Sequence, residues 1–180
     1  MTKYPGYRAK AANVSAKQRK QVHAEALRAM SAIRLIVLTG ARKGEVLQAT
    51  WRQFDLERGV WTKPSHSTKR KRSEHVPLND QAIAFLKSLP KSGEFLFPGR
   101  QSSHLSDLKY PWAEVCDAAK LEGVRIHDLR HTYASHLVSR GVPLTMVGKL
   151  LGHTQPQTTA RYAHLADSPL RAAANLFPVL

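Results

Sequence analysis

Apolar residues recur at helical spacing early in the chain. From Val22 to Val37 they follow steps of three and four residues, which predicts a helix with one face packed against a core. Gly40 closes that helix, because glycine readily takes the left-handed conformation that ends helices. A second helix is predicted from Lys43 to Thr50. Arg42 is therefore expected in a tight turn between two packed elements.

Short apolar segments separated by turn residues come next. Residues 54–56 and 60–62 flank a Glu57-Arg58-Gly59 turn, which is typical of a β-hairpin. Residues 75–78 offer a third strand. We therefore predict a small three-stranded antiparallel sheet.

Helical spacing resumes after the sheet. Asn79 or Asp80 can cap a helix over residues 81–89, which Pro90 ends. Residues 105–121 predict a longer helix, interrupted near Tyr110-Pro111. Its expected core stripe consists of Leu108, Trp112, Val115 and Ala119.

The C-terminal third contains the most closely spaced helix-ending residues. Residues 126–140 predict a helix that Gly141 and Pro143 end, and a shorter helix over residues 143–151 stops at Gly152, which brings His153 to a helix exit. The expected apolar stripe of the longer helix consists of Ile126, Leu129, Tyr133 and Leu137.

The combined pattern predicts an α+β fold, mainly helical with the small three-stranded antiparallel sheet. A chain of 180 residues is long enough for one domain with a full core. We assign that domain to residues 21–180. Residues 1–20 carry six cations and no acid, so we expect a basic arm that either follows a DNA backbone or stays solvated.

The composition indicates the binding partner and the cellular compartment of the protein. The 28 Lys and Arg against 13 Asp and Glu give a net charge of +15, the sign that a polyanion attracts, so nucleic acid is the expected partner. The single cysteine, Cys116, lies in an apolar helical pattern and excludes a disulfide framework. Apolar runs such as Leu35 to Leu38 are too short to span a membrane. We expect a cytoplasmic protein that does not associate with membranes.

Four polar residues of the C-terminal third can serve one chemistry. His127 and Arg130 are three apart, so on one helical face they can reach the same ligand, while His153 and Tyr162 follow nine residues apart. Guanidinium binds two phosphate oxygens and imidazole can donate to a third. Tyrosine supplies a nucleophilic oxygen. Such a phosphate site still needs a second cation and an acid for the leaving oxygen.

These motifs resemble the catalytic domain of the tyrosine recombinase (phage integrase) family. HDLRHTYASHL, LLGH and TTARYAH match three of the family's boxes in order, and TGARKGEVLQATW resembles the box with its first catalytic arginine, here Arg42. TKRKRSEHVPL resembles the hairpin with the catalytic lysine, eight residues before the proline, here Lys69 rather than Lys71. The four consecutive cations of residues 69–72 are also compatible with a merely solvated basic loop.

The resemblance implies a bacterial or phage enzyme that breaks and rejoins double-stranded DNA without a cofactor, metal or ATP. The implied catalytic residues are Arg42, Lys69, His127, Arg130, His153 and Tyr162. Tyr162 would attack the phosphate, His127 would take its proton, and Lys69 would protonate the leaving oxygen. Family members self-associate on DNA, so a tetramer is expected in the synaptic complex and a monomer in the free state.

Other interpretations of the same residues stay open. A type IB topoisomerase uses similar chemistry, and a non-catalytic DNA-binding remnant would keep the basic surface. Most full-length relatives carry a separate DNA-binding domain before this one, which residues 1–20 are too short to form. His127 and His131 stand four apart like a zinc pair, but the intervening Arg130 argues against a divalent ion. His131 is expected in a packing or supporting role.

Overall fold

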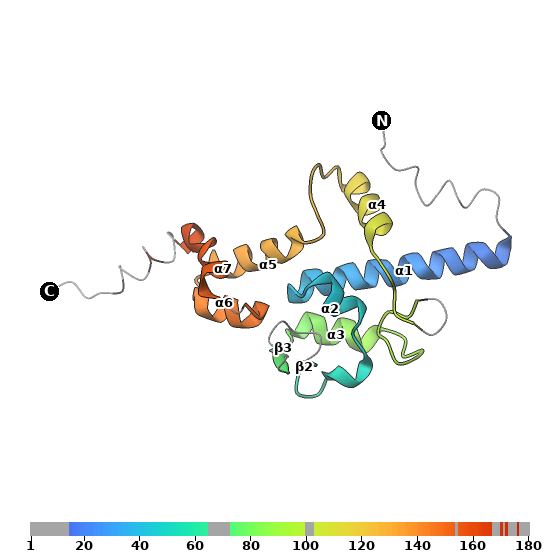
Figure 1. Cartoon of the computed structure of the whole chain (residues 1–180), viewed down its shortest axis with the longest axis horizontal. Coiled ribbons are helices and arrows are strands. Elements are labelled where there is room, and N and C mark those ends of the chain that lie inside the picture. The colour runs from blue at the N-terminus through green and yellow to red at the C-terminus, as the bar shows by residue number, and fades with distance from the viewer. Residues whose placement is uncertain are drawn as a thin grey trace.

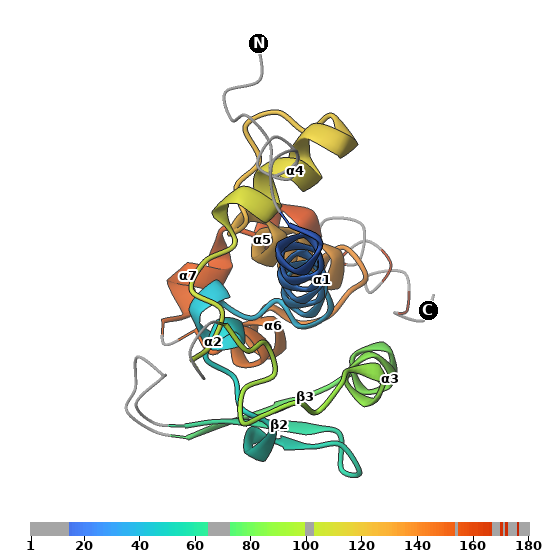
Figure 2. The ribbon, with the colours of Figure 1, turned by 90° about the vertical axis from the view of Figure 1, so that its right-hand side faces the viewer.

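A computed structural model of the protein describes residues 15–64, 73–99, 103–153 and 155–166, together with residues 170, 172 and 176. The long helix α1 (Ala16–Thr39) runs through the middle of the molecule. The sheet and α3 (Asp80–Ser88) lie on one side of it, and α4 (Lys109–Ala119) lies on the opposite side (Figure 2). The C-terminal helices gather at the C-terminal end of α1 (Figure 1).

Helix α1 begins six residues before the first apolar position of its predicted stripe. The Ser15 side chain accepts a hydrogen bond from the Gln18 backbone, and the Gln18 side chain accepts one from the Ser15 backbone. This reciprocal cap satisfies two orphan N–H groups, so the helix starts in a stretch without core-facing residues. Residues 16–20 of the expected basic arm are thus helical, and residues 1–14 lie outside the described residues.

The turn that carries Arg42 is confirmed. Gly40 ends α1 in the left-handed conformation with φ of 62°, and α2 (Lys43–Leu47) starts directly after Arg42. Helix α2 is three residues shorter than predicted. Instead of continuing the helix, the following residues form a β-bridge between Thr50 and Phe95 and a short 3-10 turn, η2 (Trp51–Gln53).

The three-stranded antiparallel sheet is also confirmed. Strands β1 (Phe54–Asp55), β2 (Val60–Lys63) and β3 (Glu74–Pro77) are in chain order, with Trp61 opposite Phe54 on one side and Val76 on the other. Strand β2 alternates between half-buried and buried positions, so its second and fourth residues, Trp61 and Lys63, both face inward.

Helices α3 and α4 differ in how well the sequence predicts them. Asn79 caps α3 by accepting a hydrogen bond from Ala82 N, as predicted. Helix α4 begins only at Lys109, and Pro111 does not interrupt it. Proline is tolerated in a first turn because the N–H groups there have no partner within the helix. The predicted stripe fails at Ala119, which is exposed.

The C-terminal helices are short. They are α5 (Asp128–Val138), α6 (Leu144–Leu151) and α7 (Pro156–Ala160), followed by the 3-10 turn η4 (Ala163–Ala166). The predicted stripe of α5 is only half-buried. Its most buried residues are Arg130, Ala134 and Val138, so the helix is rotated towards a charged residue. His127 stands at the N-cap position, before the helix begins.

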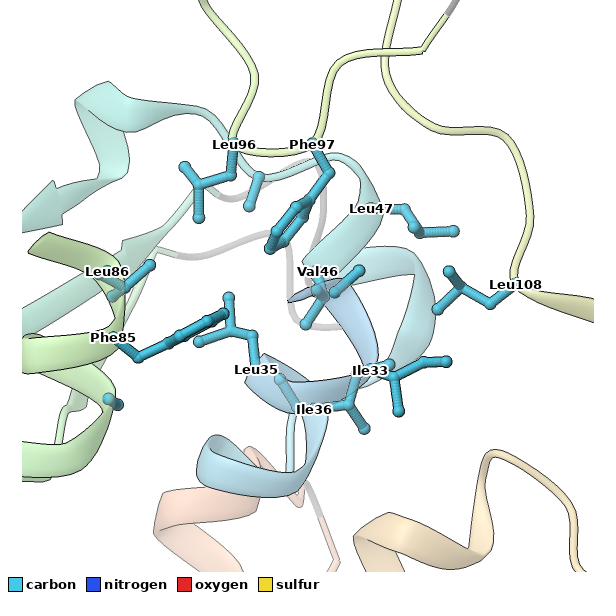
Figure 3. Close-up of a cluster of buried hydrophobic side chains, with 14 of the residues drawn as sticks. Ile33, Leu35, Ile36, Val46, Leu47, Phe85, Leu86, Leu96, Phe97 and Leu108 are labelled. Carbon is cyan, nitrogen blue, oxygen red and sulfur yellow. The ribbon is translucent and has the colours of Figure 1, made fainter. Parts of the chain in front are cut away.

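Among the described residues, the buried hydrophobic side chains form two clusters. The larger cluster fills the space between α1, α2, α3 and the sheet (Figure 3) and is represented by Leu35, Val46 and Phe97. The smaller cluster lies between α5, α6 and the C-terminal turn and contains Val138, Val147, Leu151 and Tyr162. Cys116 is half-buried and packs against the larger cluster.

No helix in the described part of the chain is long and apolar enough to cross a membrane. The architecture confirms the expected α+β class, a mainly helical domain with a small three-stranded antiparallel sheet.

Candidate active site

Arg42 is held by a carboxylate three residues further along the chain. Its Nη1 donates to Glu45 Oε1 at 2.6 Å, and its backbone N donates to Glu45 Oε2 at 3.1 Å. The Arg42 side chain is 31% exposed, whereas Glu45 is 4% exposed. The Arg42 Nη2 also lies 3.4 Å from the carbonyl oxygen of Gly152. The guanidinium is therefore fixed on one edge and accessible on the other.

Arg130 lies buried between the C-terminal ends of two helices. Its Nη1 donates to Gly40 O at 2.8 Å, at the end of α1, and its Nη2 donates to Leu151 O, at the end of α6. The carbonyl end of a helix carries partial negative charge, so two such ends stabilise a buried cation. Burial and the nearby Arg42 lower the pKa of Arg130 to about 10, which leaves it charged at neutral pH.

Glycine is required where these helices meet. A Cβ at Gly40 would lie 2.5 Å from Tyr133 Cδ1, and a Cβ at Gly152, whose φ is 63°, would lie 2.5 Å from Glu74 Oε2. The two glycines let α5 and β3 approach the carbonyl groups that hold Arg130 and Arg42.

Tyr162 is buried directly after α7, with 6% of its surface exposed. Its hydroxyl lies 2.5 Å from His131 Nδ1, and the His131 ring in turn lies edge-on to the His127 ring with centroids 5.1 Å apart. Burial raises the pKa of the Tyr162 hydroxyl, an effect that the nearby Arg161 and Arg130 oppose. The phenol thus needs a proton acceptor, and a histidine nitrogen stands at hydrogen-bond distance.

The ring nitrogen nearest to the Tyr162 hydroxyl belongs to His131, which we expected to pack or support. Helical spacing alone did not show this contact, because Tyr162 lies 31 residues further along the chain. His127, the predicted base, is exposed at the start of α5 and touches His131. Partial burial of its ring, together with His131 and Arg130, lowers the pKa of His127. The His127 ring is therefore neutral at neutral pH and can accept a proton.

His153 follows Gly152, which ends α6 in the left-handed conformation, and lies near Arg42 and Arg130. Its Nδ1 lies 2.8 Å from the Thr159 hydroxyl of α7, which fixes the ring orientation. Burial and the charges of Arg130 and Arg42 lower the pKa of His153 to about 4. At neutral pH it is therefore a neutral ring that can donate one N–H to an oxygen anion.

The described structure thus brings together Arg42, Arg130, His153 and Tyr162. The His127 ring lies beyond the His131 ring, which separates it from Tyr162. Lys69 lies outside the described residues. Two charged residues outside the predicted catalytic set join the site: Glu45, and Lys63 at the end of β2, whose Nζ lies 2.6 Å from Glu45 Oε2. The R-x-x-E spacing of Arg42 and Glu45 was a visible signal of the first contact. Among the described residues, no group of three or more metal-ligating side chains occurs.

The sequence pattern of the phage integrase family matches residues 10–168. Because that match covers most of the chain, the protein belongs to the phage integrase family, and the resemblance seen in its motifs is confirmed.

Individual relatives support the same assignment. The integrase of Salmonella phage P22 is 32% identical over 155 residues, which cover 78% of this chain and 40% of that protein. The tyrosine recombinase XerD of Vibrio cholerae is 28% identical over 166 residues, covering 83% of this chain and 53% of XerD. The chain spans about half the length of these curated relatives.

Solved structures share the fold. The catalytic domain of bacteriophage HP1 integrase superposes with a TM-score of 0.63 at 30% identity, covering 83% of this chain and 82% of that domain. The XerH site-specific recombinase, in a pre-cleavage complex with its difH substrate, gives a TM-score of 0.67 at 28% identity and covers 95% of this chain and 50% of XerH.

Proposed function

We propose that the protein is a site-specific DNA recombinase in which Tyr162 is the nucleophile. The tyrosine oxygen bonds to the scissile phosphorus, and the bond from phosphorus to the 5′ oxygen breaks. The products are a 3′-phosphotyrosyl linkage and a free 5′-hydroxyl. Attack by the 5′-hydroxyl of another DNA end reverses these steps and joins the strands, so neither ATP nor a metal is consumed.

One observation carries this proposal: two arginines and a buried tyrosine from separate segments meet at one place. Arg42 and Arg130 contact the adjacent carbonyl oxygens of Gly152 and Leu151, and the charge of Arg130 acts on the Tyr162 hydroxyl. Two guanidinium groups and the His153 N–H can hold the non-bridging oxygens of the pentavalent transition state. Fixed donors then supply the charge stabilisation that metal ions supply in other phosphoryl transfers.

Proton transfer completes the proposed mechanism. His127 remains the proposed base, and we propose that the Tyr162 proton reaches it through His131, whose Nδ1 lies 2.5 Å from the Tyr162 hydroxyl. General-base help of this kind is usually worth about 10² to 10⁴ in rate. We retain Lys69 as the proposed acid for the 5′ oxygen, on the strength of the family resemblance alone.

The proposed substrate is double-stranded DNA, and the proposed assembly on it is a tetramer. The net charge of +15 favours attraction to any duplex. Each phosphate contact should add about 0.9 to the slope of log affinity against log salt. This chain should therefore bind random duplex weakly, with a steep loss of affinity between low and physiological salt.

The test is covalent trapping on a pool of nicked duplexes of randomised sequence, from which the short 5′-hydroxyl fragment dissociates after cleavage. Wild-type protein should become attached to DNA in the presence of EDTA, and Tyr162→Phe should not. Tyr110→Phe, the same change at a 56% exposed tyrosine of α4, is the matched control and should be trapped like wild type. Attachment through another residue, or undiminished trapping of the Tyr162→Phe variant, would contradict the assignment. Loss of trapping with EDTA and rescue by zinc would support a metal enzyme instead.

A further inference from the structure

Lys63 is a buried cation beside the proposed phosphate site. It ends β2, its side chain is 2% exposed, and its Nζ lies 2.6 Å from Glu45 Oε2. The same Nζ lies 4.6 Å from the centre of the Trp61 ring. Burying a lysine is unfavourable unless its charge is paired, so a fully enclosed lysine at this position calls for a reason.

The reason for burying Lys63 lies in the contact that Glu45 also makes with Arg42. Its carboxylate accepts from both the side chain and the backbone of Arg42 and so fixes the direction of that guanidinium. A carboxylate 2.6 Å away, however, also offsets the positive charge that Arg42 should offer to a phosphate. Burial would raise the pKa of Glu45, but Lys63 and Arg42 together outweigh burial, and the pKa lies below its usual value. Glu45 is therefore ionised at neutral pH.

The charge balance of the site depends on Lys63. Its closely spaced charged groups in the described structure are the cations Arg42, Lys63 and Arg130 and the carboxylates Glu45 and Glu74. Glu74 Oε2 is buried without a hydrogen-bond partner, and its charge acts on both Lys63 and Arg130. Among these described groups, three cations against two carboxylates leave one net positive charge, which the loss of Lys63 would cancel. Arg161 also acts on this region, but it is exposed to solvent, which screens its charge.

We propose that Lys63 is a positioning residue that neutralises Glu45, so that Glu45 can orient Arg42 while Arg42 keeps its charge for a DNA phosphate. This inference rests on the proposed function for its biological meaning. Lys63 itself touches no substrate, because its side chain is enclosed and its ammonium is bound to Glu45.

The first test measures phosphate binding without any cleavage. Inorganic phosphate that binds only the folded site raises the melting temperature. Wild-type protein should show this rise, and Lys63→Met should lose most of it. The double variant Lys63→Met with Glu45→Gln should regain it, because no carboxylate then offsets Arg42. Lys87→Met, at a lysine of α3 whose side chain is 52% exposed, is the control and should respond like wild type.

The second test separates a charge effect from a folding defect. Covalent trapping is compared on a phosphodiester and on a methylphosphonate, which lacks one anionic oxygen at the scissile position. Lys63→Met should slow trapping on the phosphodiester by about tenfold, less than the roughly 10²-fold cost of removing a donor that touches the oxyanion. On the neutral methylphosphonate the defect should be much smaller.

Two results would overturn the role of Lys63. One is a full phosphate-induced rise in the Lys63→Met variant, and the other is an equal loss of trapping on both linkages. If wild-type protein is never trapped on DNA, the proposed function fails. The phosphate titration still decides whether Lys63 sets the charge of Arg42.

Discussion

The two halves of the molecule are built differently. The larger cluster surrounds α1 with helices, strands and the connecting loops, and it contains fully buried residues such as Leu35, Val46 and Trp61. The smaller cluster, between α5 and η4, has only five buried members in the described structure, and one of them is the proposed nucleophile Tyr162. The larger half holds Arg42 and Lys63 through their contacts with Glu45. The smaller half holds Tyr162, His127 and His131, the groups to which we assign bond formation and proton transfer in the proposed mechanism.

The junction between the halves is made by polar contacts. Arg130 donates to a carbonyl of each half, Gly40 O and Leu151 O, and Arg42 reaches Gly152 O. Both arginines of the proposed site therefore keep these contacts only when the two halves are correctly docked. We infer that the site is complete only when the small half is seated on the large one.

The largest expected effect comes from emptying each cluster in turn. Leu35→Ala and Leu151→Ala each remove a side chain that is at most 1% exposed, and such changes cost about 2–5 kcal/mol of unfolding free energy. Leu35→Ala should lie near the upper end, because surrounding elements prevent its cavity from collapsing. Urea unfolding measures the loss. Hydrogen exchange should show protection lost throughout the chain for Leu35→Ala, but mainly in α5 to α7 for Leu151→Ala. Identical exchange patterns would mean that the two halves unfold as one unit.

A slightly smaller effect is expected from Gly40→Ala, which acts on the junction itself. The new Cβ would meet Tyr133 at 2.5 Å and would stand on a backbone with φ of 62°. Left-handed strain and overpacking together should cost about 2–4 kcal/mol. The control is Gly44→Ala in α2, where no atom lies within 4 Å and alanine favours the helix. Thermal unfolding that ranks the two variants equally would contradict the proposed tight junction.

Arg130→Lys should have a moderate effect on stability and a large one on activity. One ammonium group cannot satisfy both carbonyls, and an unpaired buried carbonyl costs about 1–3 kcal/mol. Covalent trapping should fall by about 10² to 10³-fold, the usual cost of losing an oxyanion donor. Arg125→Lys, in an exposed ion pair with Asp128, serves as the control for both measurements. Wild-type trapping by Arg130→Lys would show that the planar fork is not required.

The smallest expected effect is a pH dependence that originates at His153. Its pKa is about 4 in the folded protein, against a value of about 6.5 for an unfolded chain. The unfolded state therefore binds the proton more readily. The stabilisation from the neutral ring is fully present above pH ~6.5 and is lost as the pH falls towards 4. Urea unfolding at several pH values should show that His153→Gln loses less stability over this window than wild type. His23→Gln, at an exposed histidine of α1, should follow wild type.

The sequence by itself determined the elements and most of the candidate catalytic residues. Helix ends at Gly40 and Gly152, the β-hairpin at Gly59 and the Asn79 cap are local events, governed by residues a few positions apart. The family motifs carry Arg42, Arg130, His153 and Tyr162 for the same reason, because each motif is short. Local rules failed where two of them competed, as at Pro111, which was wrongly predicted to break α4.

The tertiary structure alone decided which groups touch. Arg130 bonds to a carbonyl 90 residues before it, His131 meets Tyr162 31 residues after it, and Lys63 meets Glu45 across 18 residues. The rotation of α5 that buries Arg130 rather than its apolar stripe follows from two helix ends that present carbonyls to it. Spacing along a chain fixes neighbours on one element, but contacts between elements depend on how their faces pack, which the spacing alone does not specify.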